Sequence, residues 1–188
     1  EFIKRAIELG FNSVMIDASL DSFEENVRKT KEVVEYAHQL GVDVEAEIGF
    51  VGANAAASNE EVKSIYTSVE DAKKFVKETN VDSLAVSIGT SHGLYKGTPK
   101  LNFERLEELN EALAVPLVLH GGSGSGDDNL NRCATHGISK INIYSDFIYS
   151  GAKAVIEGQI ENYIDIVKLS RESMENTLEH YYKVFETK

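Results

Sequence analysis

Two periods of hydrophobic and polar positions alternate along the chain. Short, nearly continuous apolar runs, the pattern of buried strands, occur at 13–19, 42–49, 81–89, 115–120 and 138–145. Apolar residues at helical spacing predict a helix at 1–11. A further predicted helix follows each of the first four runs, and these four helices begin near Ser22, Ser68, Phe103 and Asp127. From Asp146 the helical pattern continues to the end, which predicts one long terminal helix. The pattern therefore predicts five strand–helix units in series.

Apolar strands that alternate with helices predict a parallel sheet covered by helices, because parallel strands need crossover connections. Two architectures fit this α/β pattern: an open doubly wound sheet, or part of a (β/α)8 TIM barrel. A complete barrel takes about 250 residues. Five units in 188 residues would be the last five of eight plus a C-terminal helix, with the N-terminal part absent. Nothing in composition or charge marks an internal boundary, so we assign residues 1–188 to a single domain.

The charge balance excludes some classes of partner. A formal net charge of −12 leaves no basic face for nucleic acid or for an anionic membrane. No window approaches the roughly 18 apolar residues of a membrane helix, and we find no signal peptide. The lone cysteine, Cys133, excludes an internal disulfide and fits a reducing compartment, so we expect a cytoplasmic protein with Cys133 as a buried packing residue.

Two of the predicted strands end in the same histidine–glycine step. "SIGTSHGLYKG" contains His92, and "LVLHGGSGSG" contains His120. In both candidate architectures the carboxyl ends of the strands form the ligand site. The carboxyl ends of the other three predicted strands supply Asp17, Glu45, Glu47, Asn142 and Ser145. Imidazoles beside carboxylates predict a site for a borderline metal, zinc above all. The glycine run before Asp127, at a helix start, predicts a phosphate cradle.

At these residues the sequence resembles the class II, metal-dependent ketose-bisphosphate aldolases, which act on fructose or tagatose bisphosphate. The resemblance runs from "FIKRAIELGFNSVMIDAS" to "GISKINIYSD", and its most specific part is "GTSHG" followed by Pro99 and "LVLHGGSG". It implies a TIM barrel and a homo-oligomer, either dimer or tetramer. It also implies aldol cleavage or condensation of a ketose 1,6-bisphosphate, with dihydroxyacetone phosphate and glyceraldehyde 3-phosphate as products and a metal-stabilised enediolate as intermediate.

The resemblance implies a role for each matching residue. His92 and His120 correspond to two ligands of one catalytic Zn²⁺, and Asp17 and Glu47 to carboxylates near that metal. The implied substrate and phosphate contacts, where a monovalent cation often also binds, come from Gly93, Gly121, Gly122, Ser123, Asn142 and Ser145.

Two departures from the family pattern concern catalytic residues. The third zinc histidine and the general-acid aspartate belong to an Asp-His step that we expect upstream of Glu1. The loop "FVGANAAASNEEVKS" carries alanines where relatives carry acidic residues, which leaves Glu60 and Glu61 as candidates for the proton-transfer role. The altered loop keeps an alternative open: a catalytically inactive barrel that binds sugar phosphates, or a non-catalytic supporting subunit. Within the enzymes, an aldolase for a different phosphorylated ketose also stays open.

Overall fold

A parallel five-stranded sheet forms the centre of the protein. The computed structural model describes residues 1–49, 66–91 and 97–187. The strands lie in chain order and every neighbouring pair is parallel: β1 (Ser13–Ile16), β2 (Asp43–Ile48), β3 (Ser83–Val86), β4 (Leu117–Leu119) and β5 (Ile138–Ile141). The predicted parallel α/β sheet is therefore confirmed, although the strands are shorter than the apolar runs that predicted them.

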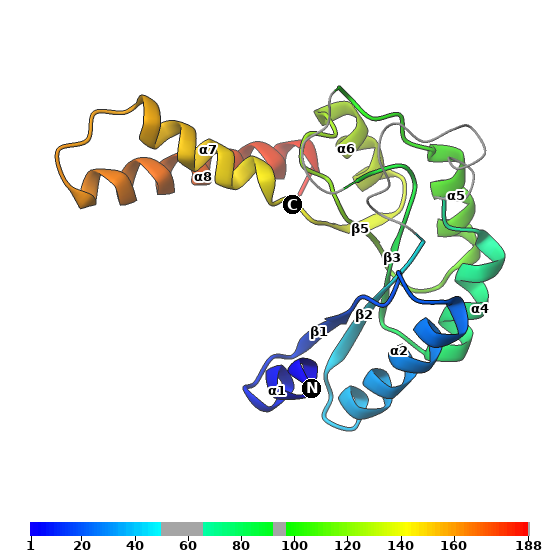
Figure 1. Ribbon diagram of the computed structural model, residues 1–188. Helices are drawn as coiled ribbons and strands as arrows, with labels where there is room; N and C mark the ends of the chain where they lie inside the picture. Colours follow the sequence, from blue (N-terminus) through cyan, green and yellow to red (C-terminus); the bar gives the residue numbers. More distant parts are fainter. Residues whose placement is uncertain (50–65, 92–96, 188) are drawn as a thin grey trace.

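Helices cover one side of this curved sheet. After α1 (Phe2–Glu8), the helices between strands are α2 (Phe23–His38), α4 (Val69–Thr79), α5 (Phe103–Ala112) and α6 (Asp127–Thr135). Figure 1 shows α2, α4, α5 and α6 together on one side of the sheet. Serine residues cap the N-termini of α2 and α4. The side chain of Ser22 accepts a hydrogen bond from the Glu25 N–H, and that of Ser68 accepts one from the Asp71 N–H.

The strands separate an apolar face from a polar one by simple alternation. The apolar residues belong to the main core under the helices: Val44, Ala46, Ile48, Leu84, Val86, Leu117 and Leu119. The residues between them face the other way and are matched across the sheet by register: Glu47 with Ala85, Ala85 with Val118, and Val118 with Lys140. The second face therefore carries the charged side chains.

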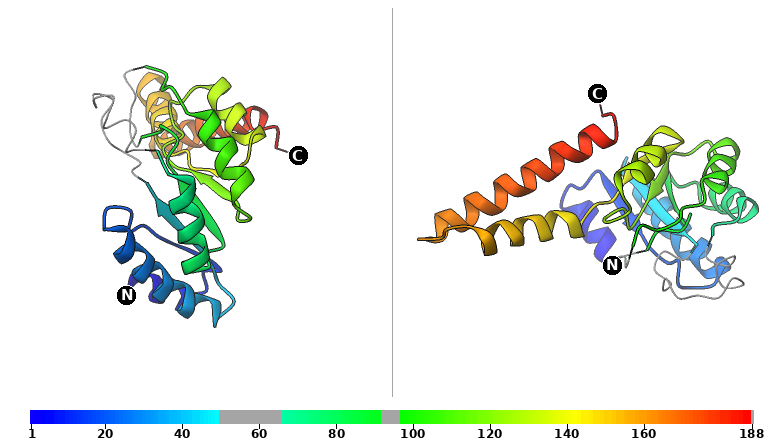
Figure 2. Two further views of the ribbon diagram at one scale, coloured as in Figure 1. Left: turned by 90° about the vertical axis from the view of Figure 1, so that its right-hand side faces the viewer. Right: turned by 90° about the horizontal axis from the view of Figure 1, so that it is seen from above.

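The chain from Ser145 onward forms two helices instead of the single helix that the pattern predicts. Helix α7 (Ser145–Glu157) ends at Gly158, whose backbone is extended, and α8 (Tyr163–Val184) begins after Asn162. Asn162 and Asp165 form a reciprocal capping box that stabilises the new start. The prediction of one continuous helix was wrong because helical spacing of apolar residues persists on both sides of the break. Figure 2 shows the α7–α8 pair projecting away from the sheet as an arm.

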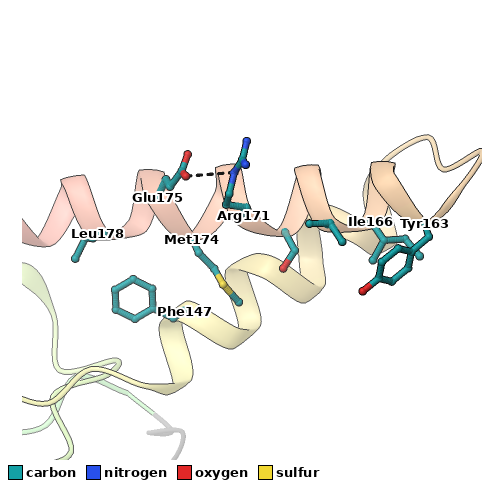
Figure 3. Close-up of a pocket in the computed structure, with 9 residues that line it drawn as sticks. Phe147, Tyr163, Ile166, Arg171, Met174, Glu175 and Leu178 are labelled. Atoms are coloured by element: carbon teal, nitrogen blue, oxygen red, sulfur yellow. Dashed lines mark ion pairs between the residues drawn. The ribbon is translucent and has the colours of Figure 1, made fainter.

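The arm carries an apolar groove of about 480 Å³ between its two helices. Phe147 on α7 and Met174 on α8 lie between the two helices, whereas the Arg171–Glu175 ion pair, which also belongs to the lining, extends from α8 away from α7 (Figure 3). The groove brings no metal-ligand histidine or carboxylate pair together, so the candidate chemistry lies elsewhere. None of the helices in the described ranges combines the length and the apolar character that crossing a bilayer requires.

Candidate active site

A buried imidazole lies between two carboxylates on the polar face of the sheet. His120 directly follows β4, and Glu45 and Glu47 lie on β2, two strands away. The Nδ1 atom of His120 is 2.6 Å from Glu47 Oε2, and its Nε2 atom is 3.0 Å from Glu45 Oε1. The side chains of His120, Glu45 and Glu47 are only 4%, 7% and 2% exposed. Each ring nitrogen therefore faces its own carboxylate inside the protein.

Strand register and side-chain size explain how β2 and β4 share this contact. Glu45 and Glu47 are two residues apart, so both point to the same face. Ala85 on the intervening β3 lies beside Glu47 on one side and Val118 on the other. The β3 neighbour of Glu45 is Ser83, which is also short, so both long glutamate side chains can pass over β3 and reach the imidazole.

The carboxylates decide the charge of the ring. Burial alone would lower the pKa of His120, but the hydrogen bonds to Glu45 and Glu47 outweigh it and raise the pKa to about 9. Burial opposes ionisation of Glu45 too, yet the contacts with His120 and Lys140 leave the pKa of that carboxyl below its ordinary value. In this arrangement the imidazole is a cation at neutral pH, and Glu45 is an anion.

Lys140 on β5 completes the charge cluster. Its Nζ atom is 2.7 Å from Glu45 Oε2, the oxygen that does not face His120. This lysine is not among the site residues that the sequence predicts. A signal was available, because Lys140 stands two residues before Asn142 in a predicted strand, on the face that leads to the ligand edge.

The donor types of the cluster suit a borderline divalent metal such as zinc, which binds imidazole and carboxylate groups. A carboxylate on one nitrogen of a ligating histidine is also the usual way in which such a ring is oriented. Within the described ranges, however, no group of three histidine, cysteine or acidic side chains is placed to hold an ion. Both ring nitrogens of His120 already face carboxylates, so a metal there has to displace or share one of these partners.

The glycine run after His120 is tied to the end of β5. The Gly122 N–H donates to the Asn142 carbonyl at 3.1 Å. A Cβ at position 122 would lie 2.8 Å from both Ile141 and Ile143, so only glycine fits this approach without a shift of its neighbours. Close packing thus accounts for Gly122, and its N–H group is already engaged.

The next two residues are bound to the start of α7. The Ser123 hydroxyl accepts a hydrogen bond from the Tyr144 N–H at 3.0 Å, and the Gly124 N–H donates to the Asp146 carboxylate at 3.0 Å. Asp146 also accepts a hydrogen bond from the Tyr181 hydroxyl on α8. The loop that the sequence predicts as a phosphate cradle therefore also connects β4 to the arm.

The remaining predicted site residues lie at the same edge of the sheet or outside the described ranges. Asp17 follows β1 and is exposed, and its carboxylate accepts hydrogen bonds from the backbone and hydroxyl of Ser19. Asn142 is exposed after β5, Ser145 is the first residue of α7, and Gly121 has a positive φ of 68°. His92, Gly93, Glu60 and Glu61 lie outside the described residues.

Comparison with known proteins places the chain in an aldolase family. A family model described as "Fructose-bisphosphate aldolase class-II" matches residues 1–188. The Escherichia coli K12 protein named "Uncharacterized protein YdjI" is 40% identical over 98% of this chain and 66% of its own length. A fructose-bisphosphate aldolase of Staphylococcus aureus strain Mu50 is 45% identical over 82% of this chain and 54% of that protein. The chain thus spans about half to two thirds of the length of these curated relatives.

Solved structures agree with the sequence matches. The crystal structure of the YdjI aldolase from Escherichia coli K12 covers 97% of this chain and 64% of its own, with a TM-score of 0.85 at 39% identity. A structure of a putative fructose-1,6-bisphosphate aldolase from Coccidioides immitis covers 98% of this chain and 67% of its own, with the same TM-score at 31% identity. The described sheet and helices are therefore part of an α/β barrel. The barrel alternative of the sequence analysis is confirmed, and the open doubly wound sheet is wrong.

Proposed function

Because the chain belongs to the class II fructose-bisphosphate aldolase family, we propose that it contributes the metal-binding edge of a carbon–carbon lyase. The substrate we propose is a ketose 1,6-bisphosphate, fructose or tagatose, and the products are dihydroxyacetone phosphate and glyceraldehyde 3-phosphate. One observation carries this proposal: a buried histidine lies between two buried glutamates at the carboxyl end of a parallel sheet. That edge is where barrels place their active sites.

We assign His120, together with His92, to one catalytic Zn²⁺. A bound zinc ion would supply a Lewis acid that withdraws electrons from the reacting carbonyl of the substrate. The protein's own part is to hold the imidazole in one orientation. Glu47 does so through its 2.6 Å contact with Nδ1, in a place where both side chains are almost fully removed from water. Burial strengthens this electrostatic contact.

The loop after His120 is our proposed site for a substrate phosphate. Its contacts with β5 and α7 hold Gly121 and Ser123 next to the histidine, and Asn142 lies at the adjoining strand end. Ser145 belongs to the same proposed phosphate contacts. The proton-transfer role stays with Glu60 and Glu61, and Asp17 stays a candidate carboxylate near the metal.

The experiment uses the intact gene product that contains these residues, freed of metal with a chelator and reloaded with Zn²⁺. We expect release of triose phosphate from fructose or tagatose 1,6-bisphosphate, measured by coupled enzymatic detection, and loss of that release when the chelator is added again. We also expect His120→Ala to lose both bound zinc and activity. His136→Ala is the matched control, because His136 is an exposed histidine whose ring contacts Thr135. Normal zinc content in His120→Ala would contradict the assigned ligand.

A catalytically inactive barrel is the alternative, and the alanines at 53 and 55–57 in the acid-poor loop favour it. Such a protein, or a supporting subunit, would bind the bisphosphate without turnover. Isothermal titration with fructose 1,6-bisphosphate separates the two cases: tight binding with no triose phosphate released at any metal loading would favour the alternative.

A further inference from the structure

Helix α8 presents an apolar stripe along the groove of the α7–α8 arm. The apolar residues that α8 contributes to the groove are three, four or seven positions apart, so they share one face of the helix: Tyr163, Ile166, Val167, Met174 and Leu178. Tyr163 is 76% exposed and Val167 is 45% exposed. Apolar side chains that gather on one exposed face indicate a protein interaction surface, whereas single scattered ones do not.

The position of the arm directs this surface away from the sheet. Figure 2 shows α7 and α8 projecting from the sheet, with the start of α8 at the far end of the arm. Tyr181, near the other end of α8, is buried and belongs to the main core. The arm is therefore anchored at its base and presents the rest of the stripe to a partner.

Charged residues beside the stripe indicate what the partner is. Lys168 and Glu175 lie seven positions apart, on the same side of α8, and both are exposed. Val167 and Met174 in the stripe have the same spacing. A second α8 lying antiparallel in the groove would place Val167 against Met174 of the other copy, and the same register would place Lys168 against Glu175. A parallel copy would instead place like charges opposite one another, which is unfavourable.

We propose that the groove docks α8 of a second copy of this protein in antiparallel orientation. A twofold axis then repeats each contact, and the two arms form a four-helix bundle with an apolar centre and a charged rim. The arrangement also leaves room for both sheets. Each sheet lies at the base of its own arm, so antiparallel arms send the two sheets to opposite ends of the bundle (Figure 2). The inference concerns assembly and does not depend on the proposed lyase activity.

The first test measures self-association of the intact gene product by sedimentation velocity over a range of concentrations. We expect the wild type to associate. Val167→Asp should weaken this association by about 100-fold or more, because the new charge would lie unpaired in an apolar contact. Leu40→Asp is the matched control, because Leu40 is also exposed but follows α2, outside the arm. Its association should equal that of the wild type.

The charged pair gives a test that is specific for an antiparallel second copy. Lys168→Glu alone and Glu175→Lys alone each place like charges opposite one another, so each variant should self-associate about tenfold more weakly at low salt. When the two variants are mixed, every contact again joins opposite charges, and the mixture should associate as strongly as the wild type. Lys153→Glu is the control, because Lys153 pairs with Glu157 on α7 and is not part of the groove lining.

Three results would overturn the inference: a monomeric wild type, unchanged association of Val167→Asp, or a mixture of the two charge variants that associates no better than either alone. A monomeric wild type whose Tm falls in Val167→Asp would show that another segment of the same chain covers the groove, which also contradicts the proposal. If Val167→Asp does not fold, the charge variants alter only exposed side chains and decide the question.

Discussion

Replacing Glu47 by glutamine tests whether the buried contact with His120 is ionic. The glutamine side chain keeps the length of glutamate and can still accept a hydrogen bond, but it carries no charge. Both side chains in the contact are less than 5% exposed, so water cannot compensate for the change. A hydrogen bond to a charged group contributes about 1.5–3 kcal/mol and a neutral one about 0.5–1.5 kcal/mol. The difference, about 1–1.5 kcal/mol, is the expected loss in the free energy of unfolding of Glu47→Gln.

The measurement is urea and thermal unfolding of the intact protein in buffer with a chelator, at neutral pH. For a protein of this size, each kcal/mol lowers Tm by about 2–4 °C, so we expect a fall of about 2–6 °C. Glu32→Gln is the control, because Glu32 is 60% exposed and lies 3.6 Å from Lys4 in a surface ion pair. Its cost should be no more than about 0.5 kcal/mol.

Two results would refute this reasoning. If Glu47→Gln unfolds at the wild-type midpoint, the short contact with His120 is not ionic, or it does not contribute to stability. If Glu32→Gln costs as much as Glu47→Gln, removal of a carboxylate charge destabilises the protein regardless of burial, and the geometry of the site explains nothing.

Three further predictions follow from other described contacts. Because the pKa of His120 is raised from about 6.5 to about 9, its contribution to stability is complete below pH 6.5 and is lost as the pH rises through 9. Urea unfolding of chelator-treated protein should show a fall on the order of 3 kcal/mol over this range, and a flat profile would contradict the charged ring. Cys133 is fully buried, and burial raises the pKa of its thiol to about 12. A thiol reagent at pH 8 should therefore label Cys133 only after unfolding. Rapid labelling of the native protein would disprove the burial of this side chain. Gly122→Ala should lower the free energy of unfolding by about 1–3 kcal/mol, because the added Cβ would lie 2.8 Å from Ile141. Gly97→Ala is the control in the same thermal melts, and it should be tolerated because its Cβ would meet no atom within 4 Å.

The order of strands and helices was predictable from the sequence, whereas the break between α7 and α8 near the end of the chain was not. The strands lie within short, mostly apolar runs, and α2 and α4 begin at the capping serines Ser22 and Ser68, so local patterns sufficed to place these elements. The boundary between α7 and α8 depends on Gly158 and on the capping box of Asn162, both within a stretch of uninterrupted helical spacing. The spacing of apolar residues indicates which residues lie on the same face of a helix. It does not reveal a helix break when the same spacing continues on both sides of the break.

The site was predictable in its residue types but not in its contacts. The strand-end rule selected His120 and Glu47 because their types and positions are visible in the sequence. Lys140 was missed because an isolated lysine in a strand has no motif, and its role appears only when β5 and β2 curve toward a common centre. Similarly, the sequence predicts Gly122 as part of a phosphate-binding loop, whereas its close packing against Ile141 can be seen only in the structure.

Ala85 has a consequence for any attempt to alter this protein. Its side chain has no polar atom, yet it lies in the middle strand between Glu47 on β2 and Val118 on β4, two residues before the histidine. A residue with a branched or longer side chain there would act as a wall between the two halves of the cluster while leaving every ionisable group in place. Screens that mutate only the chemically active positions would therefore overlook the residue whose smallness allows those groups to meet.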